Sequence, residues 1–400
     1  MNTSAVQVTA PVTWTERYEE VEGVVSAGPA EAQRVRVLKV GDVDAARVLV
    51  LLGGREGGAN IFRHAARQLA ETVPGLQIWA VDRREQYLAD LSGFTAGPDR
   101  ARDYYLGGRY IAQNGDTAGY AADWGLEVLV NDIRRVVRDA SDGGRRSVVL
   151  GGVSVGATAA LHYAAWDFDG VPGFTDLAGL VVADGGVYEA YRGIGLEFDL
   201  PLEAAQGWLA QIRGGAVFEN ATSIAVGLGE LPESASIWLQ LAAQYALHDP
   251  HGTAVLADQL PENRRPERRL TNRGLFGWLL DAATRHPSYS VHAGRLSDTG
   301  DWVDGGPTPL DTVAEAYAGP EPGSWVWYTL NRTMLDYVAA NGFVENEVTR
   351  FLGLRISHGA AIDVPLYAFQ SGLTGGTVGQ AAANLVQSSR ITEASLHSDL

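Results

Sequence analysis

The sequence has no cysteine among its 400 residues. It therefore has no disulfide framework, no thiolate metal site and no cysteine nucleophile. Its longest apolar runs, such as residues 48–52, are far shorter than the roughly 20 residues that a membrane-spanning helix needs. The first residues, MNTSAVQVTAPVTW, lack the basic start and apolar stretch of a secretory signal. We therefore expect a cytoplasmic protein without a membrane partner.

Positive charge is scarce as well. Lysine and arginine together number 31 against 48 aspartates and glutamates, which gives a formal net charge of −17. Such an excess of negative charge argues against nucleic acid and anionic membranes as partners, so we expect a small-molecule substrate. The hydrophobic content of 46% is that of a globular chain. Its length allows two or three domains, or one domain with a large insertion.

Strand and helix patterns alternate over the first half of the chain. Residues 18–27 and 34–40 have the alternating pattern of antiparallel strands. Four nearly continuous apolar runs then predict buried strands, at 47–52, 76–81, 147–153 and 177–183. Helical patterns separate these runs at 60–72, 121–140 and 155–166. This order predicts an α/β fold with a mostly parallel sheet and helices on both of its faces.

The pattern changes after residue 190. Helical pieces occur at 202–213, 234–245, 273–286 and 324–342, and loops rich in Pro, Gly and Asp separate them. A buried-strand pattern returns only at 364–369, followed by a helix at 377–388 and a short strand at 390–395. We therefore predict an α/β core made of residues 1–189 and 356–400, interrupted by a mainly helical insertion at 190–355.

One motif points to chemistry. Gly152-Val153-Ser154-Val155-Gly156 has the pattern G-x-S-x-G and lies between the predicted strand 147–153 and helix 155–166. A serine on such a sharp turn needs small neighbours two residues before and after it, and its hydroxyl then stands above the carboxyl ends of the strands. The following helix points its first N–H groups at a developing oxyanion. The motif predicts Ser154 as a nucleophile; the alternative is a tight turn with a packing serine.

With this motif and this order of elements, the sequence resembles the α/β-hydrolase superfamily over about residues 1–190 and 356–400. The resemblance implies a Ser-acid-His triad in that chain order, an insertion that acts as a lid, and no metal or organic cofactor. It also implies that the loop Gly53-Gly54-Arg55-Glu56-Gly57-Gly58 supplies an oxyanion donor, the backbone N–H of Arg55, alongside the N–H of Val155. The usual His-Gly pair of this loop is Gly53-Gly54 here.

The acid and the base are assigned from the same pattern. The residues after strand 364–369 read Gln370-Ser371-Gly372-Leu373-Thr374 and contain no carboxylate, so the acid is predicted one strand earlier, at Asp184. The alternative for Asp184 is a structural role at a strand end, and Glu189 is a distant reserve.

The base should be a histidine, because no other side chain titrates near neutrality without a large perturbation. His397 follows the last predicted strand, as the resemblance implies, and is the predicted base. The other seven histidines fall in core helices, in the insertion, or before a strand: His64, His162, His248, His251, His286, His292 and His358.

Together these residues predict a serine hydrolase that cleaves a carboxylic ester, lactone or related acyl compound. The tryptophans and tyrosines of the insertion suggest a bulky apolar substrate, although such residues usually serve packing. Two alternatives remain: a C–C bond hydrolase or acyltransferase that uses the same triad, and a non-catalytic binding protein with this fold. The stretch Asp82-Arg83-Arg84-Glu85 is interpreted as a salt-bridged structural turn.

Overall fold

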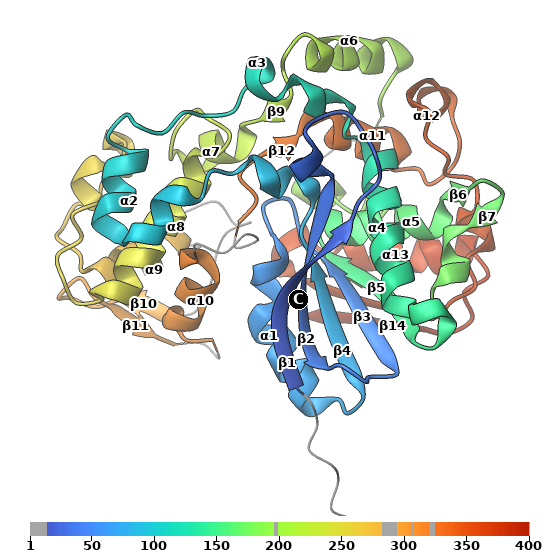
Figure 1. The fold of residues 1–400 in the computed structure, drawn as a ribbon, viewed down its shortest axis with the longest axis horizontal. Helices are drawn as coiled ribbons and strands as arrows, with labels where there is room; N and C mark the ends of the chain where they lie inside the picture. The colour runs from blue at the N-terminus through green and yellow to red at the C-terminus, as the bar shows by residue number, and fades with distance from the viewer. Residues whose placement is uncertain (1–13, 196–198, 282–293, 306–307, 320–324, 400) are drawn as a thin grey trace, which may run out of the picture.

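The computed structural model describes residues 14–195, 199–281, 294–305, 308–319 and 325–399. An eight-stranded sheet lies at the centre, in the order β1-β2-β4-β3-β5-β8-β13-β14 (Figure 1). Its strand β2 pairs antiparallel with β1 and β4, and all other neighbours are parallel. The strands are β1 (Trp14–Glu22), β2 (Arg34–Asp42), β3 (Arg47–Leu52), β4 (Leu76–Val81), β5 (Ser147–Val153), β8 (Gly179–Ala183), β13 (Leu366–Ser371) and β14 (Ala394–Asp399).

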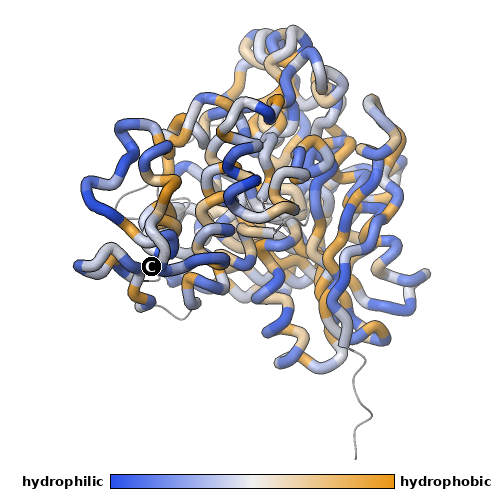
Figure 2. The backbone as a smooth tube through the Cα atoms, turned by 60° about the vertical axis from the view of Figure 1, so that its left-hand side comes forward, coloured by the Kyte–Doolittle hydropathy of each residue, from blue (hydrophilic) through white to orange (hydrophobic). Residues whose placement is uncertain are grey.

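Helices cover both faces of this sheet. On one face, α1 (Arg63–Thr72) packs Ala66 against apolar residues of β2, β3 and β4 such as Leu51 and Ile78. On the other face lie α4 (Leu126–Ser141), α5 (Val155–Ala165) and α13 (Thr377–Ser388), over side chains such as Leu150 and Leu366. Residues of the central strands such as Val50 and Leu150 are buried, and Figure 2 shows many hydrophilic segments along the periphery of the molecule. This is the burial expected of a parallel sheet between helical layers.

Residues between β8 and β13 form most of a second, mainly helical layer beside the sheet (Figure 1). Its helices are α6 (Leu202–Arg213), α7 (Ala221–Val226), α8 (Ser234–His248), α9 (Asn272–Leu280), α10 (Leu310–Ala318), α11 (Asn331–Ala340) and α12 (Glu347–Leu352). Short strands pair β9 (Phe218–Glu219) with β12 (Thr329–Leu330), and β10 (Gly294–Leu296) with β11 (Trp302–Asp304).

A segment from the first part of the chain joins this layer. Helix α2 (Pro98–Tyr105) lies between β4 and α4 in the sequence, yet the Tyr245 hydroxyl of α8 donates to Asp99 of α2 at 2.6 Å. The short helix α3 (Gly115–Ala118) belongs to the same connection. The helical layer is therefore assembled from two separate stretches of sequence.

Several predicted bounds differ from those observed. The predicted strand 18–27 is β1 at Trp14–Glu22, and the predicted helix 324–342 is only α11 at Asn331–Ala340. Residues 325–328 before α11 are not helical. The Val326 N–H donates instead to the carbonyl of Glu56, in the loop 53–58 that follows β3, at 2.8 Å. The end of the predicted helix 273–286 lies outside the described residues.

The prediction of the last strand at 390–395 was wrong. That strand is β14, whose register with β13 begins at the pair Leu366 and Ala394. Its burial pattern is exposed throughout, so no alternation of apolar and polar residues marked its bounds. His397 therefore lies inside the strand and not after it.

Candidate active site

Ser154 stands on a sharp bend between β5 and α5. Its backbone has φ 53° and ψ −127°, a conformation that is costly for a residue with a side chain. The bend is close to its neighbours: a Cβ atom on Gly156 would lie 2.2 Å from the carbonyl oxygen of Leu52, and one on Gly152 would lie 2.5 Å from the carbonyl carbon of Gly156. These contacts explain both glycines of the motif, and they leave Ser154 partly exposed at the carboxyl end of β5.

Asp184 directly follows the neighbouring strand β8 at the same edge of the sheet. Val153 of β5 is in register with Ala183 of β8, and the Ser154 N–H donates to the Ala183 carbonyl at 2.9 Å. The Asp184 carboxylate accepts from the Ser371 N–H at the end of β13, at 2.6 Å. The structure thus brings Ser154 and Asp184 to one edge of the sheet, with the carboxylate directed to a backbone donor.

A chain of hydroxyls leads away from Ser154. The Thr158 hydroxyl donates to the Gly186 carbonyl at 2.8 Å, and it also lies 2.8 Å from the Tyr191 hydroxyl. Because the Thr158 proton is already used, Tyr191 donates to Thr158. The Ser154 side chain in turn lies within interaction range of the Tyr191 hydroxyl. Burial raises the pKa of Tyr191 to about 12, so its phenol is protonated at neutral pH and its proton is directed to Thr158. Sequence reasoning missed Tyr191, because no local motif relates it to the serine.

The loop of residues 53–58 lies beside the serine. A Cβ atom on Gly54 would lie 3.4 Å from the Ser154 Cβ. The side chains of this loop bind the helical layer: Arg55 forms an ion pair with Glu219 of β9, and Glu56 accepts from the Thr222 hydroxyl of α7. The predicted oxyanion donors, the N–H groups of Arg55 and Val155, thus belong to the two backbone segments that flank Ser154.

His397 is on the outer strand of the sheet. Its ring packs against the Tyr367 ring with 5.0 Å between centroids, and its side chain is exposed. Three strand spacings separate β14 from β5, which amounts to about 14 Å. The structure therefore does not bring His397 to Ser154, and the role of His397 as base stays a prediction.

No other histidine hydrogen-bonds Ser154 in the described part of the chain. His162 is buried in α5 and contacts the Ala340 carbonyl at 3.2 Å, and burial lowers its pKa to about 4. His358 lies 3.8 Å from Asp167, whereas His64 and His248 are exposed. His286 and His292 lie outside the described residues.

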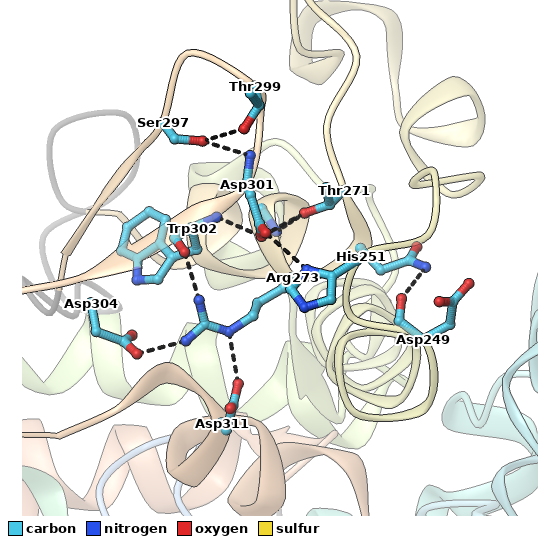
Figure 3. A network of polar contacts seen from close by, with 12 residues as sticks. Asp249, His251, Thr271, Arg273, Ser297, Thr299, Asp301, Trp302, Asp304 and Asp311 are labelled. Carbon is cyan, nitrogen blue, oxygen red and sulfur yellow. Dashed lines mark hydrogen bonds and ion pairs between the residues drawn. The ribbon is translucent and has the colours of Figure 1, made fainter.

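His251 belongs to a polar network in the helical layer. Its Nδ1 lies 2.9 Å from Asp301, which also accepts from the Thr271 hydroxyl at 2.9 Å. Nearby, Arg273 donates to Asp304, to Asp311 and to the Trp302 carbonyl (Figure 3). These bonds tie β11 and α10 to the start of α9, which indicates a structural network.

Most of the aromatic residues considered for substrate contact are buried. They are Trp238, Trp302, Trp325, Trp327 and Tyr328. Trp208 and Trp278 are partly buried and pack against the same core. A packing role accounts for these positions.

Over the described ranges, no cluster of three or more His, Cys, Asp or Glu side chains could hold a metal ion. No helix within those same ranges is long and apolar enough to span a membrane.

Solved structures of other proteins have a similar architecture. A provisionally assigned lipase from Sulfolobus solfataricus has a TM-score of 0.52 at 16% identity, over 98% of this chain and 89% of that one. Epoxide hydrolase A from Mycobacterium thermoresistibile has a TM-score of 0.42 at 15% identity, over 96% and 91%. An esterase from Thermogutta terrifontis has a TM-score of 0.39 at 12% identity, over 96% and 89%.

Together with the strand order, the first of these likenesses gives the chain the α/β-hydrolase fold, as the sequence predicted. No family model and no curated protein sequence matches the chain.

Proposed function

We propose that the protein is a serine hydrolase that cleaves a carboxylic ester, lactone or related acyl compound. The observation that carries the proposal is the positive φ of Ser154 at a strand-to-helix bend, with the loop 53–58 beside it. Ser154 attacks the carbonyl carbon while His397 takes its hydroxyl proton, and the N–H groups of Val155 and Arg55 bind the oxyanion. One such donor lowers the barrier by roughly 3–4 kcal/mol. The C–O bond of the ester then breaks, and the alcohol leaves with that proton. Water then hydrolyses the acyl-enzyme.

Asp184 and His397 complete the proposed triad. Asp184 is supported by its place beside Ser154 at the sheet edge. His397 is supported by chain order alone, and it reaches Ser154 only if the end of β14 leaves its register with β13. That strand pairs with one neighbour and is exposed throughout, so little packing opposes such a movement. A bulky apolar substrate remains part of the proposal, resting on composition.

Covalent labelling with a fluorophosphonate tests both assignments. We expect one adduct on the wild type and none on Ser154→Ala, whereas Ser147→Ala, at the opposite end of β5, keeps the adduct. His397→Asn should slow labelling by roughly a thousandfold, because a triad without its base loses most of its nucleophilicity. His251→Asn is the matched control. An unchanged labelling rate in His397→Asn would show that His397 is not the base, and the assignment of Ser154 as nucleophile would still stand.

A non-catalytic binding protein is the second candidate. It is favoured by one observation, that no histidine hydrogen-bonds Ser154 among the described residues. An unlabelled wild type that is folded, and that hydrolyses no member of an ester and lactone panel, would favour this candidate.

A further inference from the structure

Arg83 holds the backbone of the loop 53–58 from the end of the next strand. Its Nη1 donates to the carbonyl oxygens of Gly53 at 3.2 Å and of Gly54 at 2.8 Å, and its Nη2 donates to that of Arg55. Its Nε donates to the Glu85 carboxylate at 2.6 Å. The guanidinium therefore binds three successive carbonyls of one loop while a carboxylate fixes its orientation.

This ion pair is nearly free of solvent. The side chains of Arg83 and Glu85 are 10% and 8% exposed. Buried, charge-assisted hydrogen bonds are stronger and more directional than exposed ones. A surface salt bridge in a turn, as the sequence suggested, would have contributed little.

Peptide geometry connects these carbonyls to the proposed oxyanion donor. The Gly54 carbonyl and the Arg55 N–H belong to one peptide group, and in a trans peptide they point in opposite directions. No cis peptide occurs in the described residues. Fixing the Gly54 carbonyl on Arg83 therefore fixes the direction of the Arg55 N–H. The Gly57 N–H donates to the same carbonyl at 3.2 Å and closes the turn.

We infer that Arg83 is a positioning residue that preorganises the Arg55 N–H for binding an oxyanion. The inference rests on the proposed function. It gives Arg83 a role in the reaction, whereas the sequence indicated only a salt-bridged structural turn. An arginine suits this role because its planar fork presents five donors at fixed angles, whereas lysine has three donors on a flexible stem.

Arg84 provides a matched control. It is also buried, and it binds Asp132 through Nε at 2.8 Å and through Nη2 at 2.6 Å. Its further partners are Ser26 and Val24, in the connection between β1 and β2. Replacing either arginine by lysine thus disturbs a buried ion pair, but only Arg83 contacts the loop 53–58.

The experiment compares Arg83→Lys with Arg84→Lys in the full chain. We expect Arg83→Lys to lower kcat for a p-nitrophenyl ester, and the rate of fluorophosphonate labelling, by roughly ten- to a hundredfold with little change in KM, since an oxyanion donor acts in the transition state. Arg84→Lys should lower the melting temperature but change kcat less than threefold. Added ethylguanidinium should partly restore the labelling rate of Arg83→Ala.

Hydrogen–deuterium exchange of the peptide covering residues 53–59 separates this inference from the proposed function. Exchange there should be faster in Arg83→Lys than in the wild type and in Arg84→Lys, whether or not the protein turns over an ester. Unchanged exchange would overturn the positioning role. Faster exchange in Arg83→Lys, combined with a wild type that no fluorophosphonate labels, would leave Arg83 holding the loop but refute the hydrolase.

Discussion

Neighbouring residues in this chain serve different parts of the molecule. Arg83 binds the loop beside the nucleophile, whereas Arg84 binds Asp132 on α4. Local sequence could suggest the pair of Arg83 with Glu85, but not the other partners, because Asp132 and the carbonyls of the loop 53–58 come from distant segments. The same limitation applies to Tyr191, which lies 37 positions after the serine it contacts.

Tyr191→Phe tests the direction of the hydroxyl chain. A neutral phenol cannot accept the serine proton, so we expect kcat to change less than tenfold. The free energy of unfolding should fall by about 1 kcal/mol, because Thr158 loses a buried donor. Chemical denaturation and ester turnover measure the two effects.

Tyr188→Phe is the control, since the Tyr188 hydroxyl accepts an exposed hydrogen bond from Ser388. Its unfolding free energy should change by less than about 0.5 kcal/mol. A loss of activity above a hundredfold in Tyr191→Phe would instead make Tyr191 the base.

At the scale of elements, α4 is capped by a residue from the helical layer. The Leu126 N–H at the start of α4 donates to the buried carboxylate of Asp336 at 2.8 Å, and Asp336 also forms an ion pair with Arg332 at 2.9 Å. Gly125 at the N-cap has no side chain to do this. The main helix on this face of the sheet therefore depends on α11 for its N-terminal cap.

Asp336→Ala should lower the free energy of unfolding by about 3 kcal/mol, because it removes the cap and leaves Arg332 largely buried without its carboxylate. Glu345→Ala removes the exposed pair with Arg350 and should cost less than about 0.5 kcal/mol. Urea denaturation of both variants makes the comparison. Equal effects would show that the cap contributes no more than a surface pair.

Elements with a strong internal signal were predicted with their bounds. The apolar runs of β3, β4 and β5, and the helices α6 and α13, agree with the sequence patterns. Elements whose ends depend on tertiary contacts were not. Strand β14 has exposed residues only. The residues before α11 form a backbone hydrogen bond with the loop 53–58, from the Val326 N–H to the Glu56 carbonyl.

For the candidate site too, the features set by local sequence were predicted and those set by long-range contacts were not. A strand followed by G-x-S-x-G needs only local sequence, so the bend at Ser154 was foreseen. The hydrogen-bond partners of that serine come from long-range packing and were not.

At the scale of the whole molecule, stability depends on pH through buried carboxyls. Burial raises the pKa of Asp82 from 3.8 to about 6, although the Ala59 N–H donates to it at 2.6 Å. A raised pKa means that the folded state favours the neutral carboxyl. This contribution to stability is complete below pH 3.8 and is lost as the pH rises through 6.

Asp82→Asn should therefore remove a decline of about 3 kcal/mol in unfolding free energy between pH 4 and pH 6. Denaturation curves at several pH values compare its profile with that of the wild type. Glu31→Gln, which is exposed, is the control and should keep the wild-type slope. Parallel profiles for wild type and Asp82→Asn would contradict the assignment.

The loop 53–58 is also where the sheet and the helical layer are joined. Arg55 is paired with Glu219, and the Glu56 carbonyl accepts from the Val326 N–H. If the layer swings outward as a rigid body to admit a ligand, it must pull on the peptide that is proposed to stabilise the charged intermediate. The loop 53–58 would then have one conformation that lets the ligand enter and another that supports the reaction, and it could not adopt both at once.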